Sequence, residues 1–291
     1  MTLSLEYEVT GSIGGSVGAT STPCGIDEIG AIYYRRPVPP VVPSRVPEAI
    51  GAWMSNEARR AWGGVLNSSP SITWVNHPLA ISAASYKPEQ LARAKRLGFA
   101  VPDSLITNNP ERARGFYNSH GRCVIAKPIG HGEVLATMPQ DDRIIYTNVV
   151  GPDEVPNFEL VANCPTFFQQ SITKEADVRV TVVGNSVFAV DLWSQDNTWS
   201  SVDCRRENMR DMRYQIRVLP TLLEESLISL VRSYDLLFGA IDLIRDRAGK
   251  YWFLELNPAG QWAWLEQLGY GEISQALISI LSGESKAPIA P

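Results

Sequence analysis

Residues 239–264 read Gly-Ala-Ile-Asp-Leu-Ile-Arg-Asp-Arg-Ala-Gly-Lys-Tyr-Trp-Phe-Leu-Glu-Leu-Asn-Pro-Ala-Gly-Gln-Trp-Ala-Trp. Two apolar runs, 240–244 and 251–256, flank a polar segment that contains glycine, and this pattern predicts a β-hairpin. With the turn near residues 248–249, Asp242 lies across from Glu255, and Asn257 shares a strand face with Glu255 because side chains two residues apart point the same way. The oxygen-bearing side chains of Asp242, Glu255 and Asn257 therefore converge.

Converging oxygen ligands of this kind indicate a magnesium site. Mg²⁺ prefers oxygen and is typically held by one or two carboxylates together with substrate phosphates. The sequence thus predicts that Asp242, Glu255 and Asn257 bind Mg²⁺. The alternative is an exposed hairpin whose acids are merely solvated. An Asp within an aliphatic strand and a Glu between two leucines are unusual surface residues, which favours the metal site.

The spacing of these three residues resembles that of the metal ligands in ATP-grasp carboxylate ligases. The continuation over residues 257–264 is similar to the ATP-grasp maturases of ribosomally made peptides, which include the microviridin-type (graspetide) macrocyclases. The resemblance implies an α/β (α+β) chain with the ATP-grasp fold, in which two α+β lobes clamp ATP. It also implies a shortened N-terminal pre-ATP-grasp domain over residues 1–77, a central lobe over 78–168 and a C-terminal lobe with the metal site over 169–291.

The same resemblance implies residues that bind ATP. Lys127 lies in the strand-like run 124–128, where a charge needs an anionic partner, and lysines at such a place in the family meet the ATP phosphates. Lys87, ahead of a predicted helix, is similar to the other nucleotide-facing lysine, although alone it reads as a solvated lysine. The run 167–172 resembles the hinge between the lobes, which implies that Gln169, Gln170 and Ile172 contact the adenine. A glycine-containing loop at 130–132 is either a phosphate loop or a plain turn.

Two arginines are implied to act on the reacting carboxylate. Arg179 belongs to an Asp-x-Arg motif at 177–179 that the family uses near the transferring phosphate, and the alternative is a surface ion pair between strands. Arg205 opens a run of arginines that ends at Arg217, and those from 206 to 217 share one face if the segment is helical. Such a run is usually a solvated face, but the acidic substrate implied by the family favours an anion-facing role for Arg205 and Arg217.

Composition sets the broad class. The chain has 291 residues, 44% of them hydrophobic, a net charge of −5 and a pI near 5.4, so a real core is expected and nucleic acid is not. The four cysteines show no metal spacing and indicate a reduced compartment. No signal or membrane-spanning segment is visible, which predicts a cytoplasmic protein without a membrane partner.

Away from the hairpin, most of residues 1–25 reads as loop apart from one short strand, and 26–36 reads as a second strand. A tight turn at Gly184-Asn185 predicts a hairpin of 178–183 with 187–193. Apolar spacing predicts helices over 219–237 and 272–281.

The function implied by the resemblance is ATP-dependent activation of Asp or Glu side chains of a precursor peptide as acyl phosphates, followed by ester or amide cross-linking. ATP and Mg²⁺ are the implied cofactors. The precursor, with a leader and an acidic core, is the implied partner, and a homodimer is compatible with the family. Two alternatives stay open: a carboxylate-amine ligase similar to the ribosomal-protein glutamate ligases, and a non-catalytic ATP-grasp protein that binds peptide or nucleotide.

Overall fold

The computed structural model describes residues 2–7, 13–18, 24–35, 37, 41–68, 71–130, 132–134, 142–196, 202–204, 212–269 and 272–284. The chain divides into two compact units, one of Met1–Pro78 with Ser274–Pro291 and one of Leu79–Ile273. None of the helices in these described ranges is long and apolar enough to cross a membrane.

The first unit contains two small sheets and a long helix. Strands β1 (Thr2–Tyr7), β2 (Ile13–Gly18) and β3 (Cys24–Gly25) are antiparallel, and β4 (Ala31–Tyr33) runs parallel to β5 (Thr73–Val75), with α1 (Glu48–Asn67) between them in the chain. One expectation was wrong: the segment expected to be loop contains β2, because pairing with β1 supplies the ladder that its glycines and serines do not signal. The strand expected over 26–36 is present but shorter, since the 3₁₀ turn η1 (Ile26–Glu28) precedes β4.

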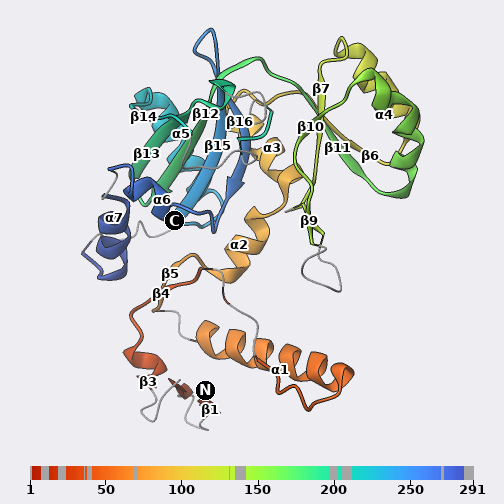
Figure 1. The fold of residues 1–291 in the computed structure, drawn as a ribbon. Helices are drawn as coiled ribbons and strands as arrows, with labels where there is room; N and C mark the ends of the chain where they lie inside the picture. Colours follow the sequence, from red (N-terminus) through yellow and green to blue (C-terminus); the bar gives the residue numbers. More distant parts are fainter. Residues whose placement is uncertain are drawn as a thin grey trace. The chain divides into compact units, whose positions relative to one another are not determined.

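The second unit contains two larger sheets (Figure 1). The first sheet has the order β10-β7-β11-β6, with strands Asn148–Val149, Val124–Lys127, Thr166–Gln170 and Ser104–Thr107. Helix α4 (Pro110–Ser119) and the 3₁₀ segment η3 (Pro152–Asn163) pack on one face. Successive side chains of a strand point to opposite faces, so Phe168 joins this core while Phe167 joins the core of the second sheet. Strands β8 (Glu133–Val134) and β9 (Arg143–Ile144) form a separate pair.

The second sheet has the order β14-β13-β12-β15-β16, with strands Tyr214–Arg217, Ser186–Leu192, Lys174–Val183, Phe238–Asp246 and Tyr251–Asn257. Helices α3 (Lys87–Arg96) and α5 (Thr221–Arg232) supply buried residues to the core on one face. The alternation of β12 is clear, because Val178, Val180 and Val182 are buried in that core. The intervening Asp177 and Arg179 therefore face the other side of the sheet, where the candidate site lies.

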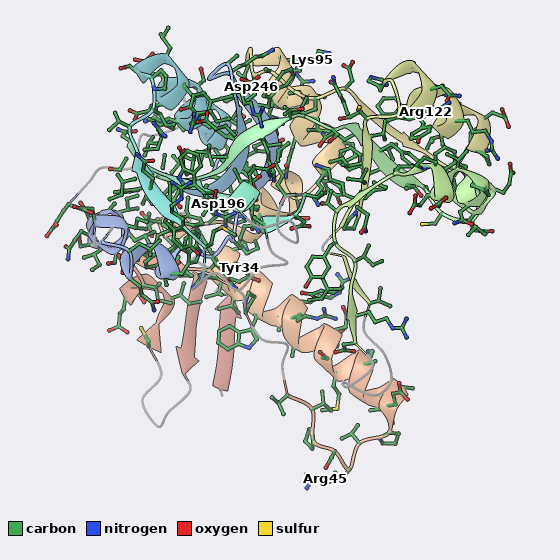
Figure 2. All side chains as sticks on the ribbon, turned by 45° about the horizontal axis from the view of Figure 1, so that its top comes forward. Tyr34, Arg45, Lys95, Arg122, Asp196 and Asp246 are labelled. Atoms are coloured by element: carbon green, nitrogen blue, oxygen red, sulfur yellow. The ribbon has the colours of Figure 1, made fainter. Side chains whose placement is uncertain are left out.

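Both predicted hairpins are confirmed. Strands β12 and β13 meet at Gly184, whose φ of 60° suits glycine, and β15 and β16 meet in a turn with Gly249 at φ 80°. Asp246, labelled in Figure 2, closes the second turn because its Oδ1 accepts the N–H groups of Ala248 and Lys250, each at 2.9 Å. The short elements α2 (Pro78–Ala84), η4 (Ser194–Asp196) and α6 (Ala263–Glu266) complete this unit, and α7 (Glu272–Leu281) occupies the range predicted for the last helix.

Candidate functional site

The middle of the β15–β16 hairpin carries the predicted metal ligands. The antiparallel register places Asp242 opposite Glu255, and Ala240 opposite Asn257. A bulge follows, because the next pair is Leu243 with Phe253. The side chains of Asp242 and Glu255 are 33% and 28% exposed, so both carboxylates are partly buried yet open to a ligand.

Arg179 on β12 is aligned with Asp242 on the neighbouring strand. Its Nη1 lies 2.6 Å from Asp242 Oδ1, and its Nη2 donates to the carbonyl of Gln261 at 3.1 Å. Gly260 leaves room for this guanidinium, since an added Cβ would lie 2.4 Å from the Cβ of Ala240 and 3.0 Å from Arg179 Nη2. Position 260 therefore requires glycine mainly because it packs against Ala240, with Arg179 next to it.

Lys87, at the start of α3, forms an ion pair with the second carboxylate. Its Nζ lies 3.0 Å from Glu255 Oε2 and donates to the carbonyls of Pro128 and Gly130, each at 3.2 Å. All three ammonium hydrogens thus have an acceptor. Lys87 joins the loop after β7 to the β15–β16 hairpin, so its ammonium is held between two parts of the candidate site and is not simply solvated.

Gln90, one turn along α3 from Lys87, was not singled out from the sequence. It is 2% exposed, its Nε2 donates to the carbonyl of Leu256 at 2.8 Å, and its Oε1 accepts the Leu256 N–H at 2.9 Å. Leu256 lies between Glu255 and Asn257 on β16, the edge strand of the sheet. Gln90 therefore replaces the missing neighbouring strand and fixes the backbone that carries two predicted ligands.

The donor set suits Mg²⁺. Two carboxylates and an amide oxygen are hard ligands that leave positions for water and phosphate oxygens. Burial raises the pKa of Asp242; Arg179 opposes the rise and Glu255 adds to it, so a cation between the carboxylates is electrostatically favoured. The described residues contain no group of three or more His, Cys, Asp or Glu side chains arranged for a metal. The set here has two acids, so Asn257 and a phosphate would have to complete it.

A pocket lies beside the hairpin within the same unit. Its lining includes the four predicted nucleotide residues Lys127, Gln169, Gln170 and Ile172. Gln170 ends β11, and Ile172 lies in the link to β12, so the hinge of the prediction forms one wall. The structure thus brings these four residues together, and their contact with a nucleotide stays a prediction.

Gln169 holds Lys127 in this pocket. Gln169 is 1% exposed, its Oε1 accepts from Lys127 Nζ at 2.9 Å, and its Nε2 donates to Ser104 Oγ at 2.9 Å. Lys127 also lies over the ring of Phe167, 4.6 Å from the centroid. Both ends of the Gln169 amide are engaged inside the sheet, which gives this residue a positioning role in addition to the predicted contact with adenine.

The expected helical face can be checked only at the end of the arginine run. Arg205, Arg206 and Arg210 lie outside the described residues, while Arg217 ends strand β14 and pairs with the buried Asp191. Pairing with β13 decides the conformation of β14, which overrides the helical spacing of the arginines. Arg213, before this strand, binds Asp196 at 2.9 Å.

Sequence reasoning also missed two residues of the pocket wall. Lys174 and Asp177 line the pocket, and Lys174 Nζ lies 2.7 Å from Asp177 Oδ2. Lys174 is 8% exposed, and a buried ammonium without a carboxylate would be costly. Lys174 precedes the Asp-x-Arg motif by three positions, a spacing that would place the two side chains on opposite faces of a regular strand. The register shift between Lys174 and Ala176 brings them together, so the sequence carries no signal for this pair.

Comparison with known proteins connects this geometry to the ATP-grasp fold. A RiPP-associated ATP-grasp ligase of Chryseobacterium gregarium, in complex with ADP and a leader and core peptide, superposes with a TM-score of 0.90 and 27% identity over 98% of this chain and 85% of that chain. The macrocyclase MdnC of Microcystis aeruginosa MRC, bound with precursor peptide MdnA, gives a TM-score of 0.83 and 27% identity over 97% of this chain and 88% of that chain.

The macrocyclase MdnB of the same organism gives a TM-score of 0.74 and 25% identity, over 96% of this chain and 85% of that chain. Neither protein-family models nor curated proteins give a match. The chain therefore has the expected ATP-grasp fold, and it is similar to ligases that modify ribosomally made peptides.

Proposed function

We propose that the chain is an ATP-dependent carboxylate ligase that activates Asp or Glu side chains of a ribosomally made precursor peptide as acyl phosphates and joins them in ester or amide cross-links. One observation carries this proposal: the fold matches a RiPP-associated ATP-grasp ligase over 98% of the chain. The site agrees with it, because the Asp242–Glu255 pair and the pocket around Lys127 lie in one compact unit.

In this function the pocket binds ATP. Gln169, Gln170 and Ile172 are the proposed contacts to adenine, Gln169 also positions Lys127, and Lys127 and Lys87 face the phosphates. Asp242, Glu255 and Asn257 would hold Mg²⁺, which when bound supplies neutralisation of the phosphate charge. Arg179 contacts Asp242 and Lys87 contacts Glu255, so each of the two proposed carboxylate ligands has one cation beside it.

Catalysis of this kind needs positioning and electrostatics more than covalent chemistry by the protein. The substrate carboxylate attacks the γ-phosphorus of ATP, ADP leaves, and a hydroxyl or amine of the peptide then displaces phosphate from the acyl phosphate. Arg179 is the residue we propose beside the transferring phosphate, because its guanidinium is fixed by Asp242 and Gln261. Arg205 is proposed to face the same phosphate, on the basis of the sequence alone.

The substrate, the domain boundaries and the compartment are also part of the proposal. The solved relatives carry leader, core or precursor peptides, so we propose a precursor with an acidic core as the substrate here. We propose an N-terminal domain over residues 1–77, a central lobe over 78–168 and a C-terminal lobe over 169–291. The second boundary falls near the link between β11 and β12, where the chain passes from one sheet to the other. We place the enzyme in the cytoplasm, where peptides are synthesised.

The test is incubation of the protein with ATP, Mg²⁺ and the acidic precursor peptide encoded beside it, followed by mass spectrometry. We expect ADP and phosphate, and a peptide that loses the mass of one water for each ring. Release of AMP would point to adenylation, and a mass gain equal to one amino acid would support the glutamate-ligase alternative. Bound nucleotide without turnover would leave the non-catalytic binding protein.

A further inference from the structure

Two segments from different sheets meet at one wall of the pocket. Thr147 precedes β10 of the first sheet, and Val202 follows β13 and η4 of the second sheet; both line the pocket. The backbone N–H of Thr147 donates to Asp203 Oδ2 at 2.9 Å. Asp203 is 7% exposed, so this is a charge-assisted and largely buried hydrogen bond between positions far apart in the chain.

The segment 202–204 is anchored to the second sheet as well. Lys174 Nζ donates to the carbonyl of Val202 at 3.5 Å and binds Asp177 at the same time. The segment therefore has hydrogen bonds to both sides of the pocket, from Lys174 on β12 to Val202 and from Thr147 before β10 to Asp203.

We propose that Asp203 is a latch that holds the two walls of the nucleotide pocket together and so slows the release of the nucleotide. The proposal rests on the proposed function, because it presupposes that the pocket binds a nucleotide. Release requires the walls at Thr147 and Val202 to separate, and this separation breaks the bond to Asp203. Hydrogen bonds to an ionised acceptor are among the stronger ones in proteins, so their loss lowers the barrier to opening. Asp203 is a positioning residue, since its carboxylate contacts the backbone of the opposite wall.

The experiment measures the binding kinetics of a fluorescent ADP analogue in a stopped-flow instrument, with wild type, Asp203→Asn and Asp203→Ala. Asn keeps a side-chain oxygen of the same reach without the charge, so this variant isolates the contribution of the charge. We expect koff to rise about threefold in Asp203→Asn and about tenfold in Asp203→Ala, in line with the greater strength of bonds to charged acceptors, while kon is not reduced. A latch acts on release, whereas damage to the pocket would reduce the competent fraction and hence the apparent kon.

An unchanged koff in Asp203→Ala would overturn the latch, and so would a lower kon with koff at the wild-type value. If Asp203→Ala lacks the wild-type melting transition, it is not folded correctly and only Asp203→Asn is used. In that case a koff of Asp203→Asn equal to the wild-type value overturns the proposal. A wild-type protein that binds no ADP analogue would instead overturn the proposed function, and the latch with it. The two failures are therefore distinguishable.

Discussion

Replacing Gln90 by Met should destabilise the protein and loosen the metal hairpin. Gln90 is 2% exposed and binds both the N–H and the carbonyl of Leu256, and its Nε2 also donates to the carbonyl of Ala84. Met has a similar volume, so no cavity forms, but three backbone groups lose their partner. A buried polar group left unpaired costs about 1–3 kcal/mol, so we expect a loss of about 3 kcal/mol or more in the free energy of unfolding.

The assay is thermal unfolding followed by circular dichroism, with ligase activity measured well below the transition. One kcal/mol shifts the midpoint by about 2–4 °C in a unit of this size, so about 3 kcal/mol should lower Tm by about 6–12 °C. Activity should fall even at temperatures where the chain is folded, because Leu256 lies between Glu255 and Asn257. Gln275→Met, the same change at an exposed position of α7, is the control and should leave Tm unchanged. A Tm of Gln90→Met within about 2 °C of wild type would refute the reasoning, because a shift that small corresponds to a loss of less than about 1 kcal/mol.

Three further predictions concern the site itself. Glu255→Gln should reduce ADP formation at least about 100-fold, because metal ligation contributes several kcal/mol, yet lower Tm by only about 2–4 °C; near-wild-type turnover would contradict the metal assignment. Arg179→Lys keeps the charge but cannot bind Asp242 and a carbonyl in one fork, so kcat should fall about tenfold or more, and an unchanged kcat would remove Arg179 from the reaction. Lys127→Met should raise the Kd of ADP in calorimetry about tenfold through the loss of one charged contact, and an equal Kd would show that Lys127 is structural.

The parts of the fold that could be predicted are local. Both hairpins have a turn with glycine at positive φ between runs of alternating or apolar residues, and these signals span only a few positions. The register next to the turn pairs Leu243 with Phe253, and the bulge between Asp242 and Leu243 then sets Asp242 opposite Glu255. The ATP-grasp fold was predicted correctly because this hairpin and its continuation are characteristic of the family.

The parts that could not be predicted depend on contacts between distant segments. Gln90 lies on a short amphipathic helix whose sequence does not show that it docks on an edge strand. The bond of Asp203 to Thr147 and the position of Lys174 in the pocket likewise arise only when the two sheets come together. The end of the arginine run shows the same dependence: its spacing would suit a helix, but within the described residues pairing with β13 makes residues 214–217 a strand.

The two carboxylates of the β15–β16 hairpin explain the positions of the neighbouring cations Arg179 and Lys87. Like charges directly opposite each other on neighbouring strands are destabilising, and the register makes Asp242 and Glu255 such a pair. Arg179 and Lys87 each contact one member, so the hairpin keeps two partly buried carboxylates in the folded protein without leaving them unpaired. Nucleotide phosphates offer these two cations new anionic partners, and a divalent cation offers the carboxylates a stronger one. Arg179 and Lys87, which stabilise the carboxylate pair in the protein alone, are therefore the groups that would contact the nucleotide phosphates, while the carboxylates would contact the metal. Binding a metal alone or a nucleotide alone would engage only one of these two sets.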